Sequence, residues 1–196
     1  MKAVSFLHQK GGTGKSTLAI GAATALAARG ERVLLLDADH QGTSAEWGNR
    51  FGHGFKVSTG AHVQPGLEDA LEGLARDQDW VIIDGPPSLS SITEGILRAS
   101  NKVIIPVRPA PPDLWALPWL AAIAEKLRRE GRGPRPLVVV NMHQGEPLEP
   151  VLAEIAELQL PTHPQPLPAH PAFPALFEGH ALPEHLAKLL LDLLLD

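Results

Sequence analysis

Eight residues that begin at Lys10, KGGTGKST, combine three glycines, two lysines and hydroxyl side chains in one short loop. Glycines let a backbone pass close to a polyphosphate and aim its N–H groups inward. Lys15 is placed to reach the β- and γ-phosphates of a nucleotide, and the Ser16 hydroxyl is placed to bind Mg²⁺. We therefore expect this loop to bind a nucleoside triphosphate.

Carboxylates follow two later apolar runs. Asp37 and Asp39 end the run LLLDAD, and Asp84 ends the run WVIID. If these runs are parallel strands, their carboxyl ends meet at the edge where α/β sheets bind ligands. Carboxylates there can hold Mg²⁺ or orient an attacking water. The alternative is a local cap of a turn or helix, which fits each carboxylate singly better than it fits the set.

Short β-rich apolar runs alternate with longer helical patterns, which is typical of βαβ units around a parallel sheet. The runs are continuously apolar, as expected when helices cover both faces of the sheet. The glycine-rich loop lies between the first run and a helical pattern, the context that phosphate binding requires. The predicted strands span residues 3–8, 32–39, 80–85, 102–107 and 136–142. The predicted helices span residues 15–29, 67–76, 90–99, 114–130, 147–158 and 183–195.

Composition narrows the class of protein. With 196 residues and 44% hydrophobic content, the chain is long enough for one sizeable core, and we expect one domain over residues 1–196. The absence of cysteine excludes disulfides and iron–sulfur ligation and fits a cytoplasmic location. A net charge of -5 argues against coating nucleic acid with the whole surface, although a local basic patch stays open. We expect neither a secretory signal nor a membrane span, which needs ~20 apolar residues.

The glycine-rich loop departs from the ordinary pattern G-x-x-x-x-G-K-[ST], because Gln9 takes the place of the first glycine and a lysine follows it. This resembles the deviant Walker A motif of the ParA/MinD superfamily. The resemblance implies an α/β fold of the three-layer P-loop NTPase type, with a mostly parallel central sheet flanked by helices. It also implies ATP and Mg²⁺ as cofactors, and a Lys10 side chain that reaches across a dimer interface to the partner's nucleotide. The expected nucleotide-binding residues are Lys10, Gly11, Gly12, Thr13, Gly14, Lys15, Ser16, Thr17 and Asn141.

The resemblance also implies roles outside the loop. Asp39 matches the aspartate that the family's D-x-D-P-Q motif associates with hydrolysis, while His40 replaces the proline and puts the hydrolytic rate in doubt more than the binding. Asn141 follows the last predicted strand, where relatives often have an asparagine that contacts adenine. The expected catalytic residues are Lys10, Lys15 and Asp39, and the expected metal-binding residues are Ser16, Asp37 and Asp84.

A cluster of basic residues surrounds a predicted helix end in EKLRREGRGPR, which begins at Glu125. Relatives bind DNA non-specifically as ATP-bound dimers, through basic residues in the C-terminal half, and phosphate contacts of this kind are salt-sensitive. The alternative is that the cations complement the helix C-terminus, and the acidic residues of the segment dilute the cluster. Both interpretations stay open. The candidates for DNA contact are Arg128, Arg129, Arg132 and Arg135.

Three other segments carry weaker signals. PVRPAPPDLWAL, residues 106–117, resembles the proline-rich segment that lies beside the nucleotide and dimer contact in short ParA proteins, or it is an ordinary loop. The nine histidines are scattered without compact ligand spacing, so we expect surface or loop positions and no metal site. The last helical pattern has a mainly acidic polar stripe, which anionic lipid would repel, so we expect it to pack against the sheet.

The resemblance covers nearly the whole chain and implies a short ParA-type ATPase acting in plasmid or chromosome partition. We expect an ATP-dependent homodimer that binds non-specific DNA, is cytoplasmic and nucleoid-associated, and is stimulated by a ParB-like or small centromere-binding protein. Unstimulated turnover should be slow, because no arginine finger of its own is obvious. One alternative is a MinD-like or other ATPase that positions a protein or membrane cargo, although membrane binding is not expected here. Another is a P-loop ligase, against which Lys10 argues.

Overall fold

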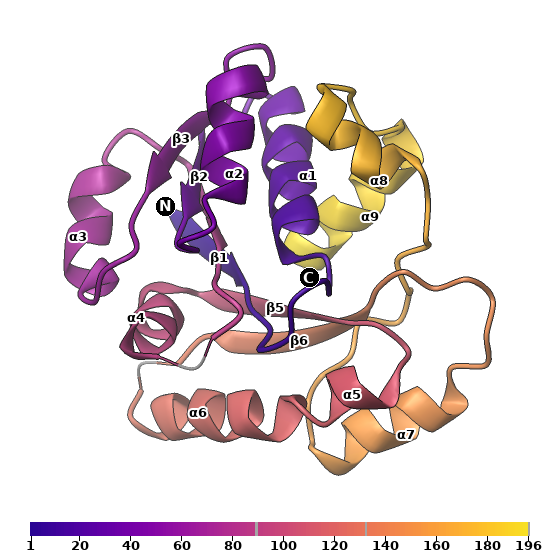
Figure 1. Ribbon diagram of the computed structural model, residues 1–196. Coiled ribbons are helices and arrows are strands. Elements are labelled where there is room, and N and C mark those ends of the chain that lie inside the picture. Colours follow the sequence, from indigo (N-terminus) through magenta and orange to yellow (C-terminus); the bar gives the residue numbers. More distant parts are fainter. Residues whose placement is uncertain (89, 132, 196) are drawn as a thin grey trace.

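The computed structural model describes residues 1–88, 90–131 and 133–195. A six-stranded sheet runs through it in the order β3-β2-β4-β1-β5-β6, and all adjacent strands are parallel. Helices cover both faces, so the predicted three-layer α/β fold is confirmed (Figure 1). The strands are β1 (Lys2–Phe6), β2 (Val33–Asp37), β3 (Ser58–Ala61), β4 (Trp80–Asp84), β5 (Lys102–Val107) and β6 (Arg135–Val140).

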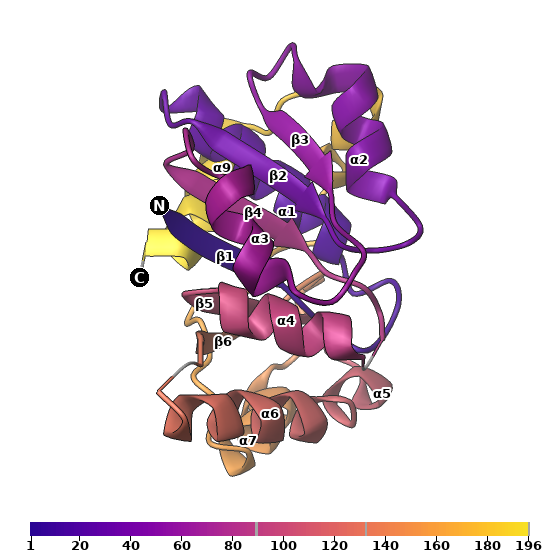
Figure 2. The ribbon, with the colours of Figure 1, turned by 90° about the vertical axis from the view of Figure 1, so that its left-hand side faces the viewer.

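The helices divide between the two faces of the sheet (Figures 1 and 2). On one face, α1, α2, α8 and α9 pack over a shared core, and on the other face α3, α4, α6 and α7 pack over a second core. The helices of the first face are α1 (Lys15–Ala28), α2 (Thr43–Trp47) with the π-helical turn η1 (Gly48–Gly52), α8 (Ala172–Ala175) with the 3₁₀ turn η2 (Leu176–Glu178), and α9 (Glu184–Leu195). Those of the second are α3 (Leu67–Leu74), α4 (Ser91–Ala99), α5 (Pro111–Leu114), α6 (Leu117–Arg129) and α7 (Glu149–Glu157).

Successive side chains of each central strand enter opposite cores. Leu35 and Ile82 belong to the core beneath α1 and α9, whereas Leu36 and Ile83 belong to the core beneath α3 and α4. Because strand side chains alternate between faces, a strand covered on both faces must be apolar at every position. This explains the uninterrupted apolar runs of the sequence.

The five predicted strands are confirmed with small differences at their ends, while the edge strand β3 was not predicted. Its sequence STGA is small and polar, and in the described part of the chain it is an edge strand that pairs with β2. The predicted helix over 114–130 is confirmed as α6, which begins three residues later and ends one residue earlier, while the short α5 before it and α2 with its π-helical turn were not predicted. Among the described residues, no helix is both long and apolar enough to cross a membrane.

The register of the parallel strands brings the candidate site residues together at one edge of the sheet. Asp84 is the register partner of both Phe6 and Asp37, so β1, β2 and β4 end at the same level. The glycine-rich loop leaves β1 at this level and leads into α1. The carboxyl edge of the sheet is therefore where the predicted site lies.

Candidate functional site

The glycine-rich loop has backbone conformations that other residues rarely adopt. Gly12 has φ 76° and Gly14 has φ 96°, both in the left-handed region. Gly14 is the N-cap of α1, and its carbonyl oxygen accepts the first helical hydrogen bond, from the Leu18 N–H at 2.9 Å. The free N–H groups and positive dipole end of α1 therefore face the loop, an arrangement that attracts phosphate.

Lys15, the first residue of α1, keeps its side chain inside the loop. It is 7% exposed, and its Nζ donates to the carbonyl oxygen of Lys10 at 3.2 Å. Burial holds the pKa of Lys15 below its usual value, while the nearby carboxylates of Asp84 and Asp39 act in the opposite direction. The ammonium group thus lies between the phosphate loop and the acidic ends of the neighbouring strands.

Asp84 is fully buried at the end of β4. Its Oδ2 accepts the Ser44 hydroxyl at 2.6 Å, whereas its buried Oδ1 has no hydrogen-bond partner among the described residues. Burial raises the pKa of Asp84 to about 6, against the opposing effects of the Ser44 and Ser16 hydroxyls and of Lys15. A buried carboxylate oxygen without a partner, next to a hydroxyl, is the hard oxygen environment that Mg²⁺ prefers. The donors present therefore fit the predicted metal.

Asp37, the last residue of β2, and Asp39, just after the strand, make different contacts. The two carboxylate oxygens of Asp37 accept the backbone N–H groups of Asp39, at 2.9 Å, and Ala45, at 2.8 Å. Asp37 thus shapes the loop that carries Asp39 and the start of α2. Asp39 is half-buried, and its Oδ1 accepts the Gln41 N–H at 3.1 Å. The water-orienting role of Asp39 and a metal role for Asp37 stay predictions.

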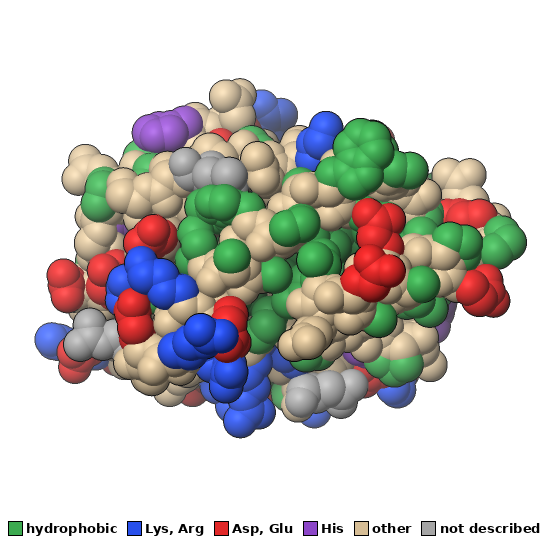
Figure 3. Space-filling view, turned by 90° about the horizontal axis from the view of Figure 1, so that it is seen from below, with side chains coloured by type: hydrophobic (Ala, Val, Ile, Leu, Met, Phe, Trp, Pro, Cys, Tyr) green, Lys and Arg blue, Asp and Glu red, His purple; other side chains and the backbone are tan. Residues whose placement is uncertain are grey.

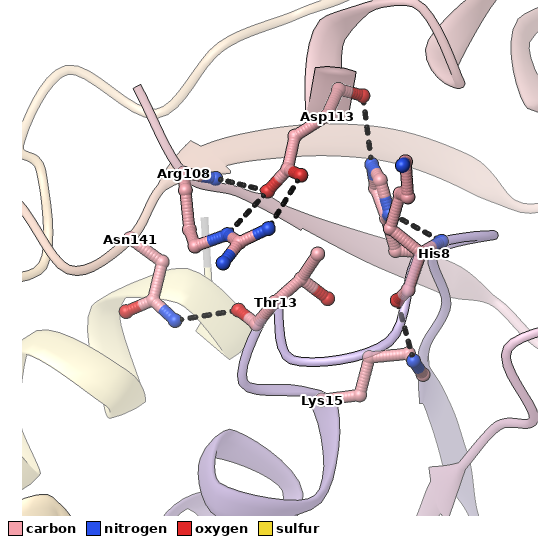
Figure 4. A network of polar contacts seen from close by, with 7 residues as sticks. His8, Thr13, Lys15, Arg108, Asp113 and Asn141 are labelled. Carbon is pink, nitrogen blue, oxygen red and sulfur yellow. Dashed lines mark hydrogen bonds and ion pairs between the residues drawn. The ribbon is translucent and has the colours of Figure 1, made fainter. Parts of the chain in front are cut away.

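Asn141, just after β6, lies against the glycine-rich loop. Its side-chain amide donates to the carbonyl oxygen of Thr13 at 2.8 Å (Figure 4). Its backbone N–H donates to the Val107 carbonyl oxygen at 2.7 Å, which ties it to the end of β5. This contact holds the loop in place and was not predicted, because the two residues are far apart in the sequence. The expected contact between Asn141 and adenine stays a prediction.

A cavity of about 440 Å³ opens beside Asn141 and the first turn of α1. It is largely apolar, which suits the base and sugar of a nucleotide whose phosphates lie in the loop. The sequence analysis missed its aromatic wall, although the repeated prolines and phenylalanines near residue 173 were a signal for it. The lining residues include Gly14, Thr17, Met142, Phe173 and Phe177.

Comparison with known proteins agrees with this geometry. Residues 4–163 match the model of the CobQ/CobB/MinD/ParA nucleotide binding domain. The chain belongs to this family. The predicted ParA/MinD resemblance is therefore confirmed, and with it the expected nucleotide-binding P-loop ATPase.

Two curated relatives of this ParA/MinD-family chain cover most of its length. It is 31% identical to the maintenance of carboxysome distribution protein A of Gloeobacter kilaueensis, over 91% of this chain and 79% of the relative. It is 32% identical to the chromosome-partitioning ATPase Soj of Thermus thermophilus, over 83% of this chain and 77% of the relative. Among solved structures, a putative plasmid partition protein of Borrelia burgdorferi bound to AMPPNP has a TM-score of 0.79 and 18% identity, over 98% and 96% of the two chains. At that identity the structural likeness shows the fold.

Three candidate DNA-binding arginines of this ParA/MinD-family chain, Arg128, Arg129 and Arg135, lie at the opposite edge of the sheet from the phosphate loop, near the start of β6. Arg128 and Arg129 both pair with Glu125, at 2.7 and 2.8 Å, and these pairs hold the pKa of Glu125 at about 2. Arg135 is exposed, and Arg132 lies outside the described residues. On the face seen from below, the basic side chains lie mixed with acidic ones on one side, and acidic side chains predominate over basic ones on the other (Figure 3). This is weaker support for a DNA surface than the sequence cluster indicated.

Proposed function

We propose that this chain is a single-domain ParA-type partition ATPase that binds ATP with Mg²⁺ and closes into a homodimer, which binds non-specific DNA. The observation that carries the proposal is the contrast between the two lysines of the loop. Lys15 is buried within its own site, beside Asp84, whereas the Lys10 side chain is exposed at the rim. An exposed lysine at this point is available to a second subunit facing the loop.

In this proposal, different residues of the chain bind the phosphates, bind the metal and orient the attacking water. Lys15 and the N–H groups of the loop hold the phosphates, and Ser16 and Asp84 hold the metal. Bound Mg²⁺ neutralises charge that develops on the phosphates. Asp39 orients the attacking water, and Lys10 of the other subunit completes the site. With no arginine finger supplied, turnover is slow until a ParB-like or small centromere-binding partner stimulates it, and the dimer is nucleoid-associated until it hydrolyses ATP.

A second candidate is an ATPase of the same mechanism that positions a protein assembly instead of DNA. It is favoured by the name of the Gloeobacter relative, which concerns carboxysome distribution. The two candidates share the ATP-dependent dimer and differ in cargo. A membrane cargo is disfavoured, because four leucines of α9 are buried in the core instead of being presented to lipid. These are Leu186, Leu190, Leu193 and Leu194.

The proposal is tested by sedimentation velocity with ADP, with ATP, and with ATP after Asp39→Ala or Lys10→Ala. We expect an ATP-dependent dimer that Asp39→Ala accumulates and Lys10→Ala abolishes. Binding of that dimer to duplex DNA of arbitrary sequence should weaken steeply as salt is raised. Liposomes of anionic lipid serve as the comparison surface.

Each contrary result has a distinct meaning. A monomer that ignores ATP contradicts the dimer mechanism altogether. A dimer that binds liposomes in preference to DNA contradicts the partition function and supports a membrane cargo. A dimer that binds neither surface supports a protein cargo held by direct contact.

A further inference from the structure

His8 is a buried histidine in the segment that joins β1 to the glycine-rich loop. It is 3% exposed, so of the two expected positions, surface or loop, it occupies a loop and is buried there. Its ring nitrogens form two contacts: Nε2 lies 3.1 Å from the Asp113 carbonyl oxygen, and Nδ1 lies 3.0 Å from the Lys10 backbone nitrogen. A backbone N–H can only donate and a carbonyl oxygen can only accept. The contacts therefore require a neutral ring with its proton on Nε2.

Asp113 of α5 connects His8 to the proline-rich segment. Its carboxylate, which is fully buried, accepts two hydrogen bonds from the Arg108 guanidinium, at 2.8 and 2.9 Å, and one from the Arg108 backbone N–H at 3.1 Å (Figure 4). Although burial opposes it, Arg108 holds the pKa of Asp113 below its usual range. Bidentate pairs of this kind fix both partners in orientation. The Asp113 carbonyl oxygen, which accepts the hydrogen bond from the His8 Nε2–H, is thus anchored.

Within the part of the chain that the structure describes, Lys10 is held through its backbone. Its N–H donates to His8, its carbonyl oxygen accepts from Lys15, and its side chain is exposed. A long lysine side chain is steered by the backbone from which it extends. A chain of contacts therefore runs from Arg108 through Asp113 and His8 to Lys10. Lys10 is the residue that reaches the partner subunit in the proposed dimer.

We propose that His8 is a positioning residue, which as a neutral acceptor fixes the backbone of Lys10 and so aims its side chain at the partner subunit. Arg108 and Asp113 in turn fix His8, which makes the proline-rich segment (residues 106–117) a support of the site instead of an ordinary loop. The inference rests on the proposed role of Lys10 across a dimer interface. It adds residues that the phosphate-loop pattern does not contain.

Protonation of His8 breaks this arrangement. A protonated ring has two donors and no acceptor, so it can no longer receive the Lys10 N–H. The charged groups that face the ring are Asp113 and Arg108 from the proline-rich segment and Lys15 from α1. Burial is the main cause that lowers the His8 pKa, Asp113 opposes it, and Lys15 and Arg108 reinforce it. The ring is therefore neutral at pH 7, and its acceptor is lost only as pH falls below the usual histidine range.

The test compares His8→Leu, which removes both ring contacts, with His8→Asn, whose Oδ1 can still accept the Lys10 N–H and does not titrate. The exposed His180 provides the control His180→Leu. All variants are made in the Asp39→Ala background, and the ATP-dependent dimer dissociation constant is measured by sedimentation. Binding of fluorescent ADP to the single subunit reports the subunit's own site.

We expect His8→Leu to weaken the ATP dimer at least about tenfold while ADP affinity changes less than about threefold. His8→Asn and His180→Leu should stay within about threefold of the parent in both assays. The parent dimer should also weaken as pH falls below the usual histidine range, more steeply than the His8→Asn dimer. This pH difference is a readout that a purely structural role would not move.

Failure of this inference is distinguishable from failure of the proposed function. If the parent does not dimerise with ATP, the proposed function fails and the inference fails with it. If the parent dimerises and His8→Leu dimerises equally well, or His8→Asn weakens the dimer as much as His8→Leu, only the inference is overturned. If His8→Leu does not fold, the pH dependence of the parent against His8→Asn decides, and identical profiles overturn the inference.

Discussion

The ammonium group of Lys15 donates to the carbonyl oxygen of Lys10 at 3.2 Å, within the loop that leads into α1. This hydrogen bond keeps the charge in the centre of the loop, with Asp84 and Asp39 nearby. A phosphate oxygen carries negative charge and is a stronger acceptor for an ammonium group than a neutral carbonyl. We therefore expect Lys15 to exchange this partner for a phosphate when a nucleotide binds.

The first prediction concerns the charge of Lys15. Lys15→Met keeps most of the side-chain length and removes the ammonium group, so ATP affinity should fall at least about 100-fold, or about 3 kcal/mol. The free energy of unfolding without nucleotide should not fall, because the variant buries an apolar group in place of a charge. Calorimetric titration and urea denaturation measure the two effects. Lys126→Met, on the exposed face of α6, is the matched control. A loss of affinity no larger than the control's contradicts the assigned role.

The second prediction concerns the buried carboxylate of Asp84, whose pKa is raised to about 6 by burial. In the unfolded chain this group ionises near pH 4, so above that pH folding must bury a charge or take up a proton. The resulting penalty is absent at low pH, grows as pH rises between about 4 and 6, and is complete above about 6. Asp84→Asn removes it. In the absence of Mg²⁺, the variant should be more stable than the parent at pH 7.5 by about 1–3 kcal/mol.

Urea denaturation at pH 7.5 and pH 5 checks this prediction, because the stability gain of Asp84→Asn should shrink at the lower pH. The same variant should lose Mg²⁺-dependent tightening of ATP binding. A variant that is less stable than the parent at pH 7.5 shows that the contact with Ser44 outweighs the cost of burying the charge. In that case the assignment of Asp84 as a metal-binding group loses its energetic support.

Sequence patterns predicted the parts of the site that follow one another along the chain. Lys15 and Ser16 were identified because loop, strand and helix are contiguous, and Asp84 because it ends a run of apolar residues. The contacts of His8 with Asp113 and of Asn141 with Thr13 join segments separated by 105 and 128 residues. They depend on which loops the strand order brings close together: these residues follow β1, β5 and β6, which lie in the order β1-β5-β6 in the sheet. No local pattern contains that order, and the small, polar sequence of β3 likewise gives no local sign of the strand that pairs with β2.

The third prediction concerns Gly14. Its φ of 96° disfavours any side chain, and a Cβ there would collide with the Asn141 side-chain amide. Gly14→Ala should therefore cost about 2 kcal/mol or more in the free energy of unfolding. Gly11→Ala is the matched control, because its Cβ would meet nothing within 4 Å and its φ is not in the left-handed region. Thermal denaturation without nucleotide compares the two, and equal losses would contradict the close approach of Asn141 to the loop.

The fourth prediction concerns the packing of α9 on α1. Leu190 is fully buried, and a Cβ at Gly21 of α1 would come within 2.7 Å of its Cδ1, so the two helices approach closely at this point. Leu190→Ala should lower the free energy of unfolding by about 2–4 kcal/mol. Leu195→Ala, at a leucine that is 50% exposed on the same helix, should change it by less than about 0.5 kcal/mol.

Urea denaturation of both variants measures how firmly α9 belongs to the core. A helix that is docked in solution cannot present the same leucines to lipid without paying the cost of undocking them. If Leu190→Ala costs no more than Leu195→Ala, α9 is not docked, its leucines are available to a lipid surface, and a membrane cargo regains support. A large difference between the two variants instead leaves the DNA or protein cargo as the candidates that the dimer experiment must separate.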